Sequence, residues 1–259
     1  MPLLKKLTWL LVGLIVVGLV AVFVFGENPG RPAVAVIALG SLSWLVMARL
    51  AHLRHAAVMR KAAADLGLDY VGTAADEKRC SFLAERRLKS EADVFRWKVD
   101  GKLPAVVGTY AGFPVVVRVP VGVDFDAGAP DSTRIVAYHG VKMTGFTIYD
   151  RSRIKKTPKG RQATLGDEAF EARYLVLAHR PEEAKTVLGP EARGALLAAG
   201  GTGFRGIEVN RYGVFLHEEG KISSVELLRH RLDVVTTLAA AARELAKAPS
   251  GGATRVGDG

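Results

Sequence analysis

Cysteine is almost absent, since Cys80 is the only one among 259 residues. One thiol cannot form an internal disulfide or a cysteine-based metal site. The sequence also lacks the H-E-x-x-H spacing of zinc hydrolases and the G-x-S-x-G turn of serine hydrolases. We therefore expect no metal and no cofactor, and we expect Cys80 to be inert.

Charge is scarce in the first fifty residues. Residues 7–25 are uncharged and would span about 28 Å as a helix, close to the hydrocarbon thickness of a bilayer. This stretch is too long for the core of a signal peptide, and no small-x-small cleavage site follows it. A second apolar stretch, 33–50, carries only Arg49. Two prolines and two glycines between the stretches stop a continuous helix, so the sequence predicts a transmembrane hairpin.

Basic residues flank the two apolar stretches, whereas the loop between them is neutral. By the positive-inside rule, both termini are predicted to be cytoplasmic, in a multi-pass protein of the inner membrane. The same residues account for most of the net charge of +10, because residues 1–61 carry +6 and the rest only +4. We therefore do not expect nucleic acid as a partner. Three small residues predict a helix–helix contact in the second span: Gly40, Ser41 and Ser43.

The rest of the chain alternates short apolar runs with turn residues. Helical spacing continues past the second span to Gly67, a residue type that often follows a helix end. Strands are predicted at 69–71, 105–110, 113–119, 133–141, 145–149, 170–178, 206–209 and 213–217, with helices at 181–188, 190–199 and 224–247. Pro114 favours an edge or a bulge in its strand. The fold class is α+β: a largely antiparallel sheet of six to eight strands with a long C-terminal helix.

These features divide the chain into three parts. Residues 1–66 form the transmembrane hairpin with a cytoplasmic helical extension, 67–247 form the cytosolic α+β domain, and 248–259 form a disordered tail. A G-x-G-x-x-G match at 201–206 does not indicate a dinucleotide site, because a predicted helix precedes it and a strand follows. The dinucleotide motif requires the opposite order.

The densest run of charge is 151–161, with six basic residues and no acid. Such a run is typical of a solvated loop. In a membrane-tethered domain it also suits anionic lipid headgroups, at about 1 kcal/mol per basic residue near the surface. The candidate membrane-surface residues are Arg151, Arg153, Lys155, Lys156, Lys159 and Arg161.

Several motifs in combination resemble a group of uncharacterised bacterial membrane-anchored proteins. They are a G-x-Y-x-G-x-P-V hairpin from Gly108 to Val115, the FTIYDR segment 146–151, the GDEAFEARYLV segment 166–176 and a Pro-Glu helix at Pro190. The resemblance covers roughly 67–247. It implies one or two N-terminal membrane helices before a cytosolic α+β domain, and it implies no catalytic residue.

Three functions remain open from the sequence. The first is a non-enzymatic, membrane-tethered module whose domain binds an unidentified protein partner, a lipid headgroup or a small ligand. The second is a structural or assembly subunit that uses the hairpin as its interface. The third is a membrane-anchored enzyme whose site gathers scattered residues such as Asp124, Asp126 and His139. A deep polar pocket that brings these three together would favour the enzyme.

Overall fold

The computed structural model describes residues 30–81, 105–118, 132–154, 158–199 and 204–247, together with Gly18. The chain divides into two compact units, Met1–Arg54 and His55–Gly259. The expected first span and the expected tail lie outside the described residues, apart from Gly18. Among the helices of the described part, none is long and apolar enough to span a bilayer.

One helix, α2 (Gly30–Asp65), contains the second apolar stretch and continues without a break beyond it. It ends just before Gly67, whose φ of 66° lies in the left-handed region that suits glycine. The last turns of α2 belong to the second unit, where Met59, Ala62 and Ala63 are buried in the hydrophobic core.

Eight strands form one sheet, and the pairings between neighbouring strands are antiparallel. Their order is β1-β2-β3-β4-β8-β7-β5-β6, so the last hairpin lies between β4 and β5 in the centre of the sheet. The strands are β1 (Asp69–Val71), β2 (Ala105–Tyr110), β3 (Phe113–Arg118), β4 (Ser132–Tyr138), β5 (Phe146–Asp150), β6 (Tyr174–Ala178), β7 (Phe204–Val209) and β8 (Gly213–Glu219).

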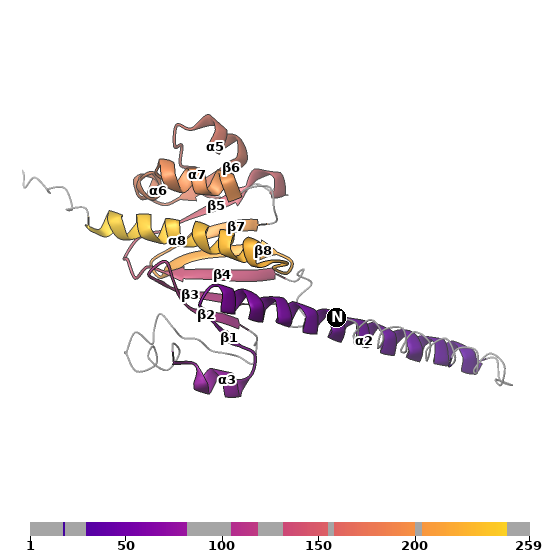
Figure 1. The fold of residues 1–259 in the computed structure, drawn as a ribbon. Coiled ribbons are helices and arrows are strands. Elements are labelled where there is room, and N and C mark those ends of the chain that lie inside the picture. Colours follow the sequence, from indigo (N-terminus) through magenta and orange to yellow (C-terminus); the bar gives the residue numbers. More distant parts are fainter. Residues whose placement is uncertain are drawn as a thin grey trace, which may run out of the picture. The chain divides into compact units, whose positions relative to one another are not determined.

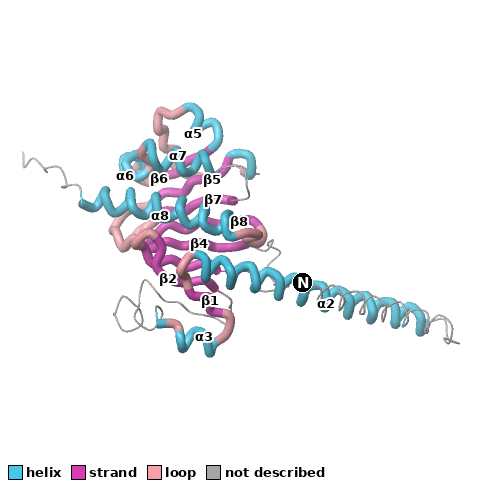
Figure 2. Tube along the Cα trace, viewed as in Figure 1, coloured by secondary structure: helices cyan, strands magenta, loops and turns pink. Residues whose placement is uncertain are grey.

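Helices cover one face of the sheet, which we call the helix face (Figures 1 and 2). They are α5 (Glu168–Arg173), α6 (Pro181–Val187), α7 (Pro190–Ala199) and α8 (Val225–Lys247), with the end of α2. On α8, Leu228, Leu232, Val235 and Leu238 recur at helical spacing and are fully buried. Each such side chain contributes about 1.5–3 kcal/mol by its burial, so α8 is anchored along its length.

The opposite side of the sheet, which we call the outer face, has a smaller apolar cluster. It consists of Val71, Ala105, Val107, Val116, Val136 and Cys80. Cys80 follows α3 (Ala74–Arg79), a short helix held at its start by a capping box between Thr73 and Asp76. The buried members of this cluster lie on β1–β4 and after α3, and Tyr138 of β4 and Phe215 of β8 pack against them.

An extra segment shields the sheet edge at β6. The amide of Ala178 donates to the carbonyl oxygen of Arg161, and the amide of Ala163 donates to that of Val176, both at 2.9 Å. Gln162 forms a bridge opposite Leu177. Residues 161–163 thus satisfy backbone groups that an edge strand would otherwise leave open to another chain.

The α+β class, the antiparallel sheet and the long C-terminal helix are confirmed. One expected strand, 170–178, is wrong in its first half. Asp167 accepts a hydrogen bond from the Phe170 amide and starts α5, so the strand begins only at Tyr174. The expected edge or bulge at Pro114 is also wrong, because β3 is an interior strand; Pro114 lies outside the β3–β4 ladder, which begins at Val115.

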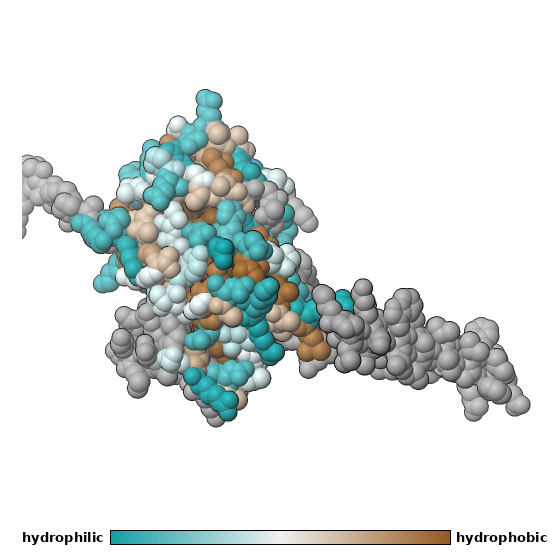
Figure 3. Space-filling model, viewed as in Figure 1, coloured by the Kyte–Doolittle hydropathy of each residue, from teal (hydrophilic) through white to brown (hydrophobic). Residues whose placement is uncertain are grey.

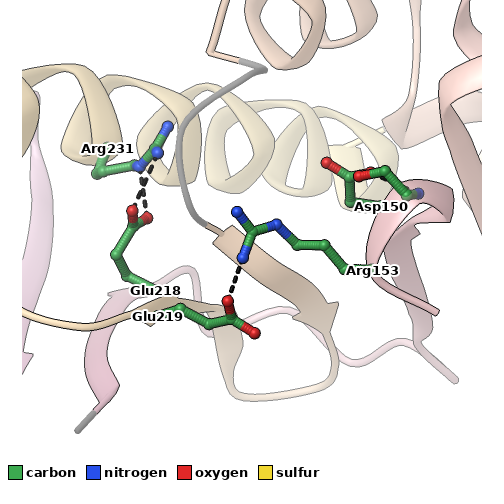
Figure 4. A network of polar contacts seen from close by, with 6 residues as sticks. Asp150, Arg153, Glu218, Glu219 and Arg231 are labelled. Carbon is green, nitrogen blue, oxygen red and sulfur yellow. Dashed lines mark hydrogen bonds and ion pairs between the residues drawn. The ribbon is translucent and has the colours of Figure 1, made fainter. Parts of the chain in front are cut away.

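A buried ion pair ties the helix layer to the sheet. Arg231 on α8 is fully buried and donates from Nε and Nη2 to the two carboxylate oxygens of Glu218 on β8, at 2.7 and 3.2 Å. Its Nη1 donates to the carbonyl oxygen of Ala199 at the end of α7, at 3.0 Å. A single guanidinium thus joins β8, α7 and α8. Figure 4 shows its contacts with Glu218.

Replacing Arg231 by Met should leave the Glu218 carboxylate buried without a counter-charge. We expect the free energy of unfolding of the His55–Gly259 unit to fall by about 3–5 kcal/mol, measured by urea denaturation. The double variant Arg231→Met/Glu218→Leu removes both charges and should recover most of that loss. A double variant as unstable as the single one would contradict this role for the pair.

Candidate functional site

The basic run 151–161 does not act as one patch. Arg151 opens a short 3-10 helix, η2 (Arg151–Arg153), and its Nε donates to the carbonyl oxygen of Glu171 at 2.8 Å. Arg153 forms an ion pair with Glu219 of β8 (Figure 4). These two arginines therefore have partners within the domain.

The other four basic residues of the run divide into two pairs. Lys155 and Lys156 lie outside the described residues. Lys159 and Arg161 are exposed and line a hollow on the outer face, where neither makes an ion pair with a described residue.

The hollow has a volume of about 260 Å³ and lies over β5, β6 and β7. Half-buried strand residues contribute Thr147, Tyr149, Leu177 and Glu208 to its lining, and the adjoining loops contribute Lys159, Arg161, His179 and Asn210. Glu208 is held in place, because its Oε1 accepts a hydrogen bond from Nδ2 of Asn210 at 2.7 Å. The hollow thus offers two cations, one carboxylate, an aromatic ring and several neutral hydrogen-bonding groups.

Beside the hollow, cationic side chains follow one another across the strands. Arg118 on β3 is paired with Arg134 on β4, which in turn is paired with His217 on β8. We call these three residues the cationic row. Their chain neighbours Val117, Ile135 and Leu216 are buried in the core of the helix face. Because successive strand residues point to opposite faces, the cationic row lies on the outer face.

An aromatic stack holds the central arginine of the cationic row. The guanidinium carbon of Arg134 lies 5.3 Å from the centre of the Phe215 ring. Tyr138 meets Phe215 edge to face, with ring centres 6.4 Å apart. Nε of Arg134 is buried and has no hydrogen-bond partner in the described part of the protein. The arginine thus lies against an aromatic ring while its Nε donor stays unused.

His217 titrates in a cationic environment. Burial lowers the pKa of its imidazole, Arg134 and Arg205 lower that pKa further, and Glu208 opposes them. At neutral pH the imidazole is therefore uncharged. An anion placed beside it would favour the protonated form.

The residues that suggested an enzyme do not come together in the described structure. Asp124 and Asp126 lie outside the described residues. His139 is buried after β4, and its Nδ1 accepts a hydrogen bond from the Val141 amide at 3.0 Å. Burial, with a further contribution from Arg243, lowers the pKa of His139 to about 4. Within the described ranges, no three His, Cys, Asp or Glu side chains are grouped as metal ligands.

The G-x-G-x-x-G match connects a helix to a strand, as the sequence analysis argued. Helix α7 ends at Ala199 and strand β7 begins at Phe204. This is the reverse of the order that a dinucleotide site needs.

A second concavity, of about 450 Å³, lies on the helix side between α8, the α6–α7 connection and the β2–β3 turn. Its wall includes Phe113, on whose ring Arg243 stacks at 3.9 Å. Figure 3, which looks onto the helix side, shows hydrophilic and apolar residues interspersed there. The charged residues that line this groove are the carboxylates Glu191 and Glu244, and Glu244 is paired with Lys247. The cations Lys159 and Arg161 line the hollow instead, so we place the candidate site on the outer face.

The sequence pointed to Lys159 and Arg161 as candidates but not to the cationic row. A signal for it exists in the strands. Arg134 and His217 each interrupt an apolar strand at a position that alternation assigns to the solvent side. What the sequence does not give is the strand order that places them side by side.

No protein-family model matches the chain, and no curated protein matches it. Among solved structures, it is similar to the crystal structure of the mycobacterial trehalose monomycolate transport factor A, TtfA. The identity is 14% and the TM-score 0.47, over 73% of this chain and 94% of that chain. At that identity and TM-score, the likeness carries no inference about function.

Because His139 is neutral in the folded domain and protonates below about pH 6.5 once unfolded, acid should destabilise the fold. We expect the free energy of unfolding to fall by about 2–3 kcal/mol as the pH drops from 7 to 4 through this residue. The variant His139→Asn, which keeps an acceptor for the Val141 amide, should lack that part of the pH dependence. Urea denaturation at several pH values measures it, and identical pH profiles for the two proteins would contradict the assignment.

Proposed function

We propose that the chain is a non-enzymatic module, anchored in the inner membrane by its N-terminal helices, whose cytoplasmic domain binds an anionic lipid headgroup or small ligand on its outer face. The observation that carries this proposal is the hollow beside Lys159 and Arg161. Both cations line it, and neither is neutralised by a described residue.

The two faces of the sheet differ in a way that supports binding rather than packing. On the helix face, the buried charges of Glu218 and Arg231 compensate each other. On the outer face, Lys159 and Arg161 beside the hollow have no ion-pair partner among the described residues. Such surface charge is available to a ligand of opposite charge.

The tether is supported by apolar side chains on α2. Trp44, Met47 and Leu53 are 48%, 53% and 48% exposed. Large apolar side chains exposed singly are ordinary, but three within about three turns of one helix suit contact with lipid. Basic residues after them, including Arg54 and Arg60, favour the cytoplasmic side for the domain.

Neutralising the hollow tests the binding role. We expect Lys159→Gln/Arg161→Gln to reduce partitioning of the His55–Gly259 unit onto vesicles of phosphatidylcholine with phosphatidylglycerol by about 30-fold, from about 1 kcal/mol per basic residue. Flotation measures the bound fraction. The matched control Lys142→Gln/Lys185→Gln removes the same charge at exposed positions elsewhere and should bind nearly as wild type. Equal binding by all three proteins would refute headgroup binding at the hollow.

A second candidate function, an assembly subunit, is favoured by one observation on α2. Gly40 is exposed, and a Cβ built there would meet no other atom within 4 Å. Ser43, one turn along, is half-buried, whereas the side chain of Ser41 lies outside what the structure describes. An open glycine lets a neighbouring helix approach closely.

If α2 mediates assembly through Gly40, then Gly40→Leu should shift the full-length protein in mild detergent from an oligomer to a monomer. Ala57→Leu adds the same bulk at an exposed α2 position outside the small-residue stretch and should leave the oligomer intact. Sedimentation or native mass spectrometry measures the mass. A monomeric wild-type protein would rule out this second function.

A further inference from the structure

We propose that Arg134, with His217 opposite it on β8, binds a phosphate group of the ligand that the outer face takes. The inference deepens the proposed function and rests on it, because both require the outer face to be the binding surface. It adds a second anchor, distinct from Lys159 and Arg161, and it names the chemistry of the bound group.

The register of the sheet brings two arginines and a histidine together. Arg118, Arg134 and His217 stand directly opposite one another on three adjacent strands. An anion beside Arg134 and His217 would be attracted by the guanidinium and would favour protonation of the imidazole.

Arg134 has the geometry of a prepared anion ligand. Its guanidinium carbon lies 5.3 Å from the centre of the Phe215 ring, and its buried Nε donates to no described acceptor. A guanidinium presents its donors as a planar fork that matches two oxygens of a phosphate. Contact with the ring restricts the side chain before binding and so removes part of the entropy loss that binding would otherwise cause.

The acidic groups on this part of the outer face have other partners. Glu219, two residues from His217 on β8, forms an ion pair with Arg153. Glu208 accepts a hydrogen bond from Asn210. It is the one carboxylate that raises the pKa of the His217 imidazole, whereas Arg134 and Arg205 lower that pKa. One carboxylate among these cations leaves a net positive site, which suits a dianion better than a monoanion.

The cationic row continues into the hollow. His217 is paired with Gly206 on β7, which is paired with Tyr149 on β5, a residue of the hollow. Gly206 has no side chain to stand between His217 and Tyr149, and a Cβ there would lie 3.1 Å from the carbonyl oxygen of Ile148. A phosphate on the cationic row could therefore belong to a ligand whose remaining part occupies the hollow.

The test uses the full-length protein in phosphatidylcholine nanodiscs. Inorganic pyrophosphate is the probe, and calorimetry measures its binding. We expect Arg134→Gln to weaken binding at least tenfold, and Arg134→Lys, which keeps the charge but loses the fork, to weaken it less. Arg180→Gln, a change at the exposed arginine that immediately precedes α6, should bind as wild type. Pyrophosphate should also raise the pKa of His217, followed by its imidazole proton resonances, because a dianion favours the protonated ring.

Stability separates a ligand-binding arginine from a structural one. Without pyrophosphate, Arg134→Gln should melt at the same temperature as wild type or higher, since it removes one cation from the row. With pyrophosphate, only wild type and Arg134→Lys should gain thermal stability. Should Arg134→Gln fail to fold, Arg134→Lys and His217→Gln still test the affinity.

A second arm identifies the source of the phosphate. If the phosphate belongs to a lipid, phosphatidic acid in the nanodiscs should compete with pyrophosphate and weaken its binding to wild type but not to Arg134→Gln. If the phosphate belongs to a soluble molecule, phosphatidic acid should have no effect. Wild type that binds no pyrophosphate, or Arg134→Gln that binds it equally well, would overturn the inference. Vesicle binding that still depends on Lys159 and Arg161 would then leave the proposed function intact.

Discussion

Side chains along a strand alternate between the two faces of a sheet, and the chemistry of this domain follows from that constraint. Helices α5–α8 and the end of α2 cover one face, so every second strand residue must be apolar or be neutralised where it is buried. The buried charge pair Arg231–Glu218 satisfies this rule because the guanidinium meets both carboxylate oxygens and a helix-end carbonyl. The strand residues that point to the outer face can be polar, and the arginines and the histidine of the cationic row lie among them.

The strand order brings these polar side chains together on one surface. Because the β7–β8 hairpin inserts between β4 and β5, His217 comes to lie beside Arg134, and Glu208 comes to lie beside Thr147. Residues that are far apart in the chain thus form one continuous surface from β3 to β6. The apolar cluster around Val116 occupies the other half of the same face and confines the charged part to the centre and the β6 side.

At the β6 edge, one loop both pairs with the sheet and places charged side chains beside the hollow. Residues 161–163 pair with β6 and protect its backbone, which places Lys159 and Arg161 beside the hollow. By contrast, the start of the same basic run is held by contacts within the domain, Arg151 by a carbonyl oxygen and Arg153 by a carboxylate. Charge density along a sequence therefore does not measure charge available to a ligand.

Local patterns in the sequence predicted the fold class, most strands and the amphipathic helix α8, because alternation and helical spacing act over a few residues. They also showed that the G-x-G-x-x-G match lies between a helix and a strand in the wrong order for a dinucleotide site. They failed at Phe170, where a side-chain cap starts a helix inside an apolar run, and at Pro114, whose interior strand depends on a distant partner. Local patterns could not predict the cationic row, because Arg134 and His217 are 83 positions apart in the chain. Pairing between strands that far apart is settled only when the whole sheet buries its apolar face, so the tertiary structure alone decided which charges meet.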